Sequence, residues 1–184
     1  MKKLVIAAAA AAATLAAPQA FAQAKNFEGF SVTAAVNANN NSAELANKVE
    51  ASRANVGVIA QYDFSIGSAF VFGLGASLGL NDFDIASNAK LQNANSIFIA
   101  PGIAFNNQTL IYGKVASVTA KADISGTSAD ISGVGYGIGA RYLTSKNVYF
   151  QGEYVLNKYD DKKIATGTFK NQTGVLSFGV GYKF

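Results

Sequence analysis

Apolar residues alternate with small or polar residues along most of the chain. Near the start, for example, Phe30, Val32 and Val36 each stand between small or polar neighbours. This period of two predicts β-strands with two unlike faces, because successive side chains of a strand point to opposite sides. We expect eight such strands, at about residues 30–37, 54–64, 70–80, 96–105, 110–119, 133–142, 148–158 and 175–184.

The connections between these strands alternate in length. Short ones are expected near residues 65–69, 106–109 and 143–147, and long polar ones near 38–53, 81–95, 120–131 and 159–172. Short turns at one rim and long loops at the other are typical of outer-membrane β-barrels. An even number of strands also leaves both ends of the mature chain on the short-turn side, which faces the periplasm.

Alternation alone fits two opposite architectures. A soluble barrel or sandwich hides its apolar face inside, whereas a membrane barrel turns that face towards lipid. A water-exposed face should carry many Lys, Glu and Asp residues, but here the second face is mostly Gly, Ser, Ala, Asn and Thr. Only 14% of the residues are charged, against about 25% in soluble domains. We therefore predict an all-β fold, an eight-stranded antiparallel up-and-down transmembrane β-barrel.

The aromatic residues support the same architecture. They gather at the ends of the expected strands, where the interfacial girdle of a membrane barrel would lie. They include Phe30, Tyr62, Phe64, Phe70, Phe105, Tyr142 and Tyr182. Closing the barrel also removes the exposed edges through which flat apolar strands would otherwise aggregate.

The first residues have the pattern of a secretory signal peptide. A positive start is followed by an apolar stretch at residues 4–17, which is too short for a membrane-spanning helix of about 20 residues. Ala20 and Ala22 form a small-x-small cleavage site, with the cut after Ala22. Cleavage after Ala24 is the alternative, because Ala22 and Ala24 satisfy the same rule.

We therefore expect a signal peptide at residues 1–22 and an outer-membrane β-barrel domain at residues 23–184. Removing the signal peptide takes away two lysines and no acidic residue, so the formal charge falls from +4 to +2. No cluster of Lys and Arg indicates nucleic-acid binding. The sequence has no cysteine, so the exported domain does not rely on disulfides.

The C-terminal strand carries apolar or aromatic residues at every second position. They are Leu176, Phe178, Val180, Tyr182 and Phe184. This segment resembles the C-terminal assembly signal of outer-membrane proteins, which implies recognition by the barrel-assembly machinery. The whole mature chain resembles the small eight-stranded outer-membrane barrels of the OmpX, opacity-protein and OmpA-barrel type. The pieces that match strand ends of this superfamily are Tyr112-Gly113-Lys114, Gly139-Ala140-Arg141-Tyr142 and Glu153-Tyr154. The resemblance implies an outer-membrane location in a Gram-negative bacterium, but the fold serves many functions.

Charged residues inside the expected strands are the best candidates for a functional site. A lysine on the lipid face near mid-membrane costs about 2–4 kcal/mol, so Lys114 should point inward. Arg141 and Glu153 have the inward phase on the next two strands and could meet Lys114. Further interior partners are Gln61, Asp63 and Gln151. Because a buried charge must be paired, the network is interpreted as a structural plug, with a gate in a narrow conduction path as the alternative.

No catalytic, metal or cofactor site is predicted. The sequence has no histidine, and this excludes most metal sites and the base that outer-membrane barrel hydrolases and acyltransferases use. Asp160 and Asp161 lie beside several lysines and indicate a solvated charge run rather than a catalytic pair. The alternating glycines of residues 133–139 indicate a strand face rather than a phosphate-binding loop, because no helix is expected after them.

Three functional hypotheses follow. The first is a non-enzymatic monomer in outer-membrane lipid, with a structural role or with loops for adhesion and envelope interaction. Its loops could bind host ligands, envelope components or lipopolysaccharide, whose phosphates would meet the lysines of residues 158–170. The second is a narrow pore for ions or small solutes. The third, a soluble periplasmic carrier, requires an internal apolar face. A porin-sized channel is excluded, because it needs roughly 16 or more strands. We favour the first hypothesis.

Overall fold

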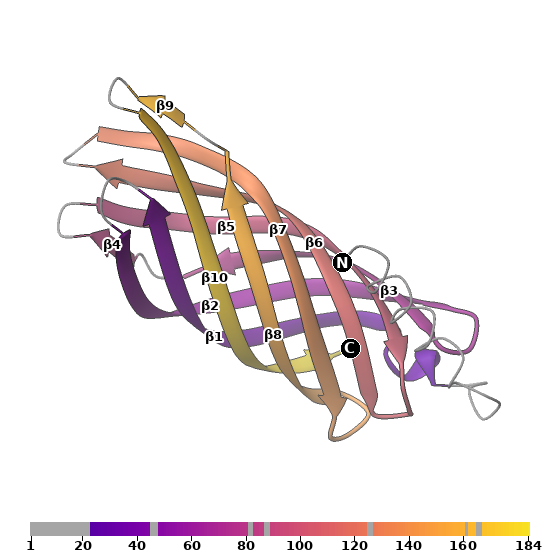
Figure 1. The fold of residues 1–184 in the computed structure, drawn as a ribbon. Helices are drawn as coiled ribbons and strands as arrows, with labels where there is room; N and C mark the ends of the chain where they lie inside the picture. The colour runs from indigo at the N-terminus through magenta and orange to yellow at the C-terminus, as the bar shows by residue number, and fades with distance from the viewer. Residues whose placement is uncertain are drawn as a thin grey trace.

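The structure is a computed structural model, and it describes residues 23–44, 48–80, 83–86, 89–124, 127–160, 162–164 and 167–184. In this part of the chain, eight antiparallel strands follow one another around a ring that closes where the last strand pairs with the first (Figure 1). They are β1 (Gly29–Glu44), β2 (Lys48–Ile66), β3 (Phe70–Gly79), β5 (Ala89–Ala104), β6 (Thr109–Ile124), β7 (Thr127–Leu143), β8 (Val148–Tyr159) and β10 (Gly167–Lys183). The predicted eight-stranded antiparallel up-and-down barrel is confirmed.

Three short elements lie outside this ring. β4 (Phe83–Ala86) pairs with β5, and β9 (Lys162–Ile164) pairs with β10. Figure 1 shows both at one end of the barrel, and the short 3-10 helix η1 (Ala24–Asn26) at the other end. The described residues contain no helix that is long and apolar enough to cross a membrane.

The connections at the β4 and β9 end are shorter than the sequence predicts. β1 continues to Glu44 and β2 begins at Lys48, so most of the predicted loop 38–53 is a regular hairpin. The predicted loop 120–131 is likewise occupied mainly by the ends of β6 and β7. Antiparallel neighbours can go on pairing their backbone groups beyond the lipid. Because side chains there need no apolar face, the alternation that predicts the strands stops before the hydrogen bonding does.

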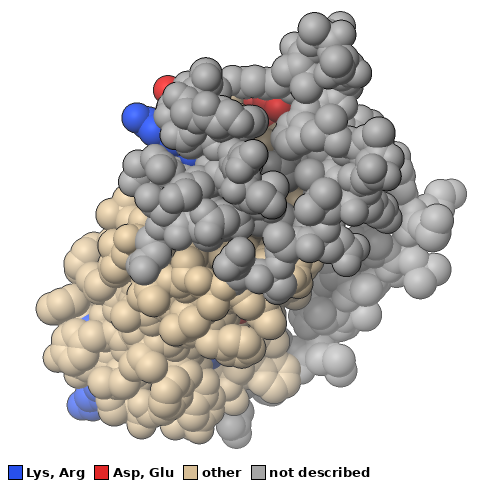
Figure 2. Space-filling view, turned by 90° about the vertical axis from the view of Figure 1, so that its left-hand side faces the viewer, with Lys and Arg blue, Asp and Glu red and all other residues tan. Residues whose placement is uncertain are grey.

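The burial of the side chains shows which face is turned outward. Large apolar residues are exposed on all eight strands of the ring, including Val36 on β1, Ile97 on β5 and Phe178 on β10. Figure 2 shows a barrel wall with very few charged side chains on its described surface. Ile59, which breaks the alternation of β2, is buried in the interior. An exposed apolar face of this extent is explained by contact with lipid.

The interior accommodates aromatic rings where the facing strand carries glycine. A Cβ atom on Gly139 of β7 would clash with the phenol of Tyr112. A Cβ atom on Gly181 of β10 would clash with the ring of Tyr149. The glycine-rich inner faces of β7 and β10 therefore leave the volume that these two rings fill, as a narrow eight-stranded barrel requires.

Candidate functional site in the barrel interior

The guanidinium group of Arg141 is the centre of a buried polar cluster near the short-turn end of the barrel. Its Nη1 donates to Asp63 Oδ2 at 2.6 Å, and its Nε donates to Gln151 Oε1 at 2.8 Å. Its Nη2 donates to Gln61 Oε1, and Gln61 Nε2 in turn donates to Asp63 Oδ1 at 2.5 Å. Only 3% of Arg141 is exposed. Each guanidinium nitrogen therefore has a partner, and the adjacent carboxylate neutralises the positive charge.

A second buried ion pair lies farther from the short turns. β8 contributes Gln151 to the first cluster and, two residues later, Glu153 to this one. Lys114 Nζ donates to Glu153 Oε1 at 2.7 Å, and the Tyr112 hydroxyl donates to Glu153 Oε2 at 2.8 Å. The ammonium group also lies 3.9 Å from the centre of the Phe98 ring. Both carboxylate oxygens are bonded, so the pair is satisfied within the lumen.

Tyr112 connects the two clusters. Its hydroxyl bonds to Glu153, while its ring centre lies 5.3 Å from the guanidinium carbon of Arg141. Tyr149 places a second ring 5.2 Å from the same carbon, and its hydroxyl shares a 2.7 Å hydrogen bond with Thr33 Oγ1. Cation–π contacts of this kind stabilise a desolvated cation by about 0.5–2 kcal/mol each. Sequence reasoning missed these two tyrosines as members of the network, although their inward phase was a usable signal.

The structure brings all six predicted interior residues into two hydrogen-bonded clusters that Tyr112 links. They are Gln61, Asp63, Lys114, Arg141, Gln151 and Glu153. The expected meeting of Lys114, Arg141 and Glu153 takes the form of two separate ion pairs, since Arg141 pairs with Asp63. Alternation predicts the face of a strand, but the register around the barrel decides which inward residues reach one another.

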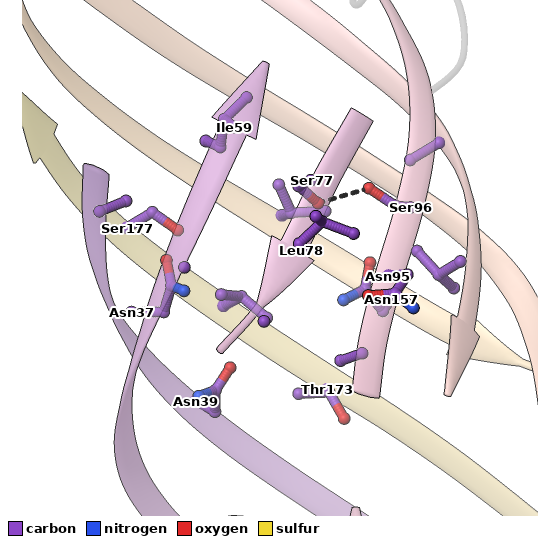
Figure 3. A pocket seen from close by; sticks show the side chains of 18 of the residues that line it. Asn37, Asn39, Ile59, Ser77, Leu78, Asn95, Ser96, Asn157, Thr173 and Ser177 are labelled. Carbon is purple, nitrogen blue, oxygen red and sulfur yellow. Dashed lines mark hydrogen bonds between the residues drawn. The ribbon is translucent and has the colours of Figure 1, made fainter. Parts of the chain in front are cut away.

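Between the second ion pair and the β4 and β9 end, the interior contains a polar chamber (Figure 3). The cavity has a volume of about 110 Å³, and Lys114 and Glu153 are among the residues that line it. Apolar side chains such as Ile59, Val118 and Val155 also line it, and carboxamide or hydroxyl groups come from Asn37, Asn39, Asn55, Ser77, Asn95, Ser96, Asn157, Thr173 and Ser177. The hydroxyls of Ser77 and Ser96 share a 2.7 Å hydrogen bond. Asn157 Oδ1 is buried without a hydrogen-bond partner among the described residues. A polar cavity of this size has room for several water molecules.

The predicted lysine-rich loop at residues 158–170 is described only in part. Lys158 is exposed at the end of β8, and the neighbouring Asp160 Oδ2 accepts a 2.8 Å hydrogen bond from Ser132 Oγ. The side chains of residues 161–171 lie outside the described residues. Contact between this loop and lipopolysaccharide therefore stays a prediction.

The residues of the predicted assembly signal lie on the outer face of β10, with Phe184 directly after its end. Leu176, Phe178, Val180, Tyr182 and Phe184 are all exposed. The ring of Phe184 lies 5.1 Å from that of Tyr182 and 5.9 Å from that of Phe30 on β1. These three rings form an aromatic cluster at the seam where the first and last strands pair. Recognition of this strand by the assembly machinery stays a prediction.

The predicted signal peptide falls on residues that the structure does not describe. Residues 1–22, with the candidate cleavage residues Ala20 and Ala22, lie outside the described part of the chain. The alternative cleavage residue, Ala24, lies inside it, in η1.

Comparison with known proteins identifies the family. The model of the family described as "Outer membrane protein beta-barrel domain" matches residues 6–184. The chain belongs to this family. This membership agrees with the apolar outer face and indicates the outer membrane of a Gram-negative bacterium. No curated protein matches the chain in sequence.

Two solved structures show the same barrel in other members of this group. One is Ail, the attachment invasion locus protein of Yersinia pestis, in complex with the heparin analogue sucrose octasulfate. It has a TM-score of 0.57 and 16% identity, and the match covers 85% of this chain and 99% of Ail. The other is Neisserial surface protein A, with a TM-score of 0.57 and 21% identity over 85% of this chain and 98% of that protein. At these identities the likeness concerns the fold, and it confirms the predicted resemblance to small eight-stranded outer-membrane barrels.

Proposed function

We propose that this family member is a non-enzymatic outer-membrane protein that binds a ligand through its hairpin loops and does not conduct ions. The observation that carries the proposal is the pair of buried ion pairs, Lys114–Glu153 and Arg141–Asp63. Their members come from β2, β6, β7 and β8, so they tie together half of the strands across the lumen. An eight-stranded barrel has room for little more than its own side chains. Recognition is then left to the loops.

A polyanionic saccharide of the envelope or of a host surface is the ligand that this proposal favours. Residues 158–170 contain four lysines against two aspartates, and Lys158 is exposed. Closely spaced lysines attract phosphate and sulfate groups at short range. Ail was solved with a heparin analogue, which is a property of Ail. The Ail complex supports the proposal as an example of a barrel of this fold that binds a polyanionic saccharide.

The ligand proposal predicts charge-dependent binding at one end of the barrel. The folded protein in lipid nanodiscs should bind heparin, and the double variant Lys158→Glu, Lys163→Glu should weaken the Kd at least about tenfold, because two attractive contacts become repulsive. Binding is measured by biolayer interferometry at low and at physiological ionic strength. Purified lipopolysaccharide serves as a second probe, to separate phosphate from sulfate recognition.

The matched control reverses two exposed lysines at the opposite end of the barrel. Lys25 belongs to η1, and Lys146 belongs to the turn between β7 and β8. The variant Lys25→Glu, Lys146→Glu changes the net charge by the same amount and should leave binding unchanged. Equal weakening by both double variants would mean that total charge, rather than the loop, attracts the polyanion.

A narrow pore is the second candidate function. The polar chamber favours it, because carboxamide and hydroxyl side chains extend from the second ion pair towards the loop end. Conduction would require both ion pairs to separate or to move aside, and their burial opposes this. Conductance distinguishes the two candidates.

Biogenesis completes the proposal. We expect export through a cleaved signal peptide, insertion by the barrel-assembly machinery and a monomeric barrel in the outer membrane. The small-x-small sequence before Gln23 and the alternating C-terminal strand support the first two steps. The closed ring supports the third, because it leaves no strand edge for a second chain.

A further inference from the structure

The residues before β1 lie against the short-turn end of the barrel rather than leading away from it. Figure 1 shows η1 at the end opposite β4 and β9. Ala24 in η1 is fully buried, and Phe27, directly after η1, is 3% exposed. Both pack into the interior apolar cluster with Leu110, Leu143 and Tyr149. Phe27 therefore lies inside the barrel mouth, on the short-turn side of the Arg141 cluster.

Polar contacts fix this segment to three separate parts of the rim. The backbone N–H of Ala24 donates to the Ser68 carbonyl at 3.0 Å, in the turn between β2 and β3. Asn26 Nδ2 donates to the Asn107 carbonyl at 3.2 Å, in the turn between β5 and β6. Lys183 Nζ, near the end of β10, donates to the Asn26 carbonyl at 2.7 Å. Anchors spread around the rim hold the segment across the mouth instead of along one strand.

The backbone of the segment depends on its first two residues. The N–H of Asn26 donates to the Gln23 carbonyl at 3.2 Å, and the N–H of Phe27 donates to the Ala24 carbonyl at 3.0 Å. A chain that began at Lys25 would lose both bonds, the bond from Ala24 to Ser68 and the buried methyl group of Ala24. A chain that begins at Gln23 keeps all of them.

We propose that residues 23–28 form a fixed plug of the periplasmic mouth and that the mature protein retains Ala24, which places the cut between Ala22 and Gln23. Water adds across that peptide bond, so that Ala22 gains a carboxylate and Gln23 gains the new ammonium group. The small-x-small rule allows this cut and the cut after Ala24 equally. Processing precedes folding, so the fold does not direct the peptidase. A mature barrel that uses Ala24 must nevertheless still contain it.

The cleavage site is tested on the native protein. The full precursor is expressed in a Gram-negative host, purified from outer membranes, and its intact mass and N-terminal peptide are measured. The proposal expects Gln23, or its cyclised form, as the first residue. A mature protein that begins with Lys25 would overturn it.

The plug is tested by cysteine accessibility. Because the chain has no native cysteine, only the introduced thiol reacts. Leu143→Cys places a thiol in the buried apolar cluster that includes Phe27, and a charged maleimide is applied to the barrel in nanodiscs. Labelling should be at least about tenfold faster when Phe27→Ala is added, because the labelling rate is proportional to the fraction of barrels in which the mouth is open. Lys25→Ala, at an exposed position of η1, is the matched control and should leave the rate unchanged.

Two further measurements keep the accessibility test decisive. Ser145→Cys, in an exposed turn at the same rim, should label rapidly in every background. A shift in gel migration between unheated and heated samples shows that each variant is folded. Equal labelling of Leu143→Cys with and without Phe27→Ala in folded barrels would show that the segment does not seal the mouth, whatever the loops bind.

Discussion

At the scale of single residues, the interior of this barrel contains charged side chains that are buried away from water and therefore pair with one another. Lys114 is 5% exposed, and its ammonium group has Glu153 as its ion-pair partner and the Phe98 ring as its neighbour. Removing one member of a buried ion pair typically costs about 3–5 kcal/mol, because the other charge stays buried. Replacing both members by apolar groups of similar size can leave the stability nearly unchanged. Comparing a single with a double replacement therefore separates the effect of an unpaired charge from the effect of packing.

Glu153→Ala should therefore destabilise the folded barrel. We expect a loss of about 3–5 kcal/mol in the free energy of unfolding, measured by urea titration in lipid vesicles, because Lys114 and the Tyr112 hydroxyl both lose their acceptor. The double variant Lys114→Met, Glu153→Leu should recover most of that loss. Lys158→Ala at the exposed end of β8 is the control, with an expected change within about 0.5 kcal/mol. An unchanged unfolding free energy for Glu153→Ala would remove the argument for a structural plug.

The sequence predicted the direction of these side chains better than their partners. Lys114 was expected inside because the alternative, a charge in lipid, carries a known cost. The pairing of Arg141 with Asp63 instead of Glu153 depends on the stagger of β2 against β7, which lie on different sides of the ring. Sequence periodicity carries no information on that stagger. The aromatic cover from Tyr112 and Tyr149 depends on the same geometry.

At the scale of elements, each strand has one face for lipid and one for the lumen. β10 shows this clearly, because Leu176, Phe178 and Val180 are exposed while Ser177 between them is buried. Its partners on both sides, β1 and β8, have the same arrangement in register. A shift by one residue would turn the whole apolar face inward. The strand order and the alternation therefore specify the same barrel.

Phe178→Lys tests the assignment of the outer face. Phe178 is 64% exposed and lies within β10, opposite Val36 of β1. In a membrane, a lysine there should cost about 2–4 kcal/mol, measured by urea unfolding in vesicles. Gln172→Lys, exposed nearer the loop end of β10, is the control and should cost no more than about 1 kcal/mol. A soluble barrel would accept both lysines equally, so equal stability of the two variants would contradict the membrane assignment.

The sequence predicted the membrane-facing parts of the elements and missed their extensions. All eight strands of the ring were expected, because the alternation of apolar residues is long and regular there. β4 and β9 have four and three residues, too few for a period of two to be recognised. The hairpin ends of β1 and β2 were taken for loop because their residues are polar on both faces. η1 has three residues, and its burial depends on a mouth that exists only in the closed barrel.

At the scale of the whole molecule, the two ends of the barrel differ in construction. The short-turn end holds the Phe27 segment, the Arg141 cluster and then the Lys114 pair, one layer after another. The opposite end holds the polar chamber and the hairpin loops. A molecule of this form has its lumen filled from the short-turn end and carries its hairpin loops at the other end. This construction suits a protein that presents loops better than one that transports solutes.

The conductance of the refolded mature protein in a planar lipid bilayer tests this account most directly. Protein whose folding has been verified by its heat-dependent shift in gel migration should produce no stable current steps. The reason is that the two ion pairs occupy the lumen. The same silence is expected across the range of salt concentrations in which the barrel stays folded. Stable, reproducible steps that change in size with Lys114→Ala or Glu153→Ala would contradict the account and make those residues the lining of a narrow pore.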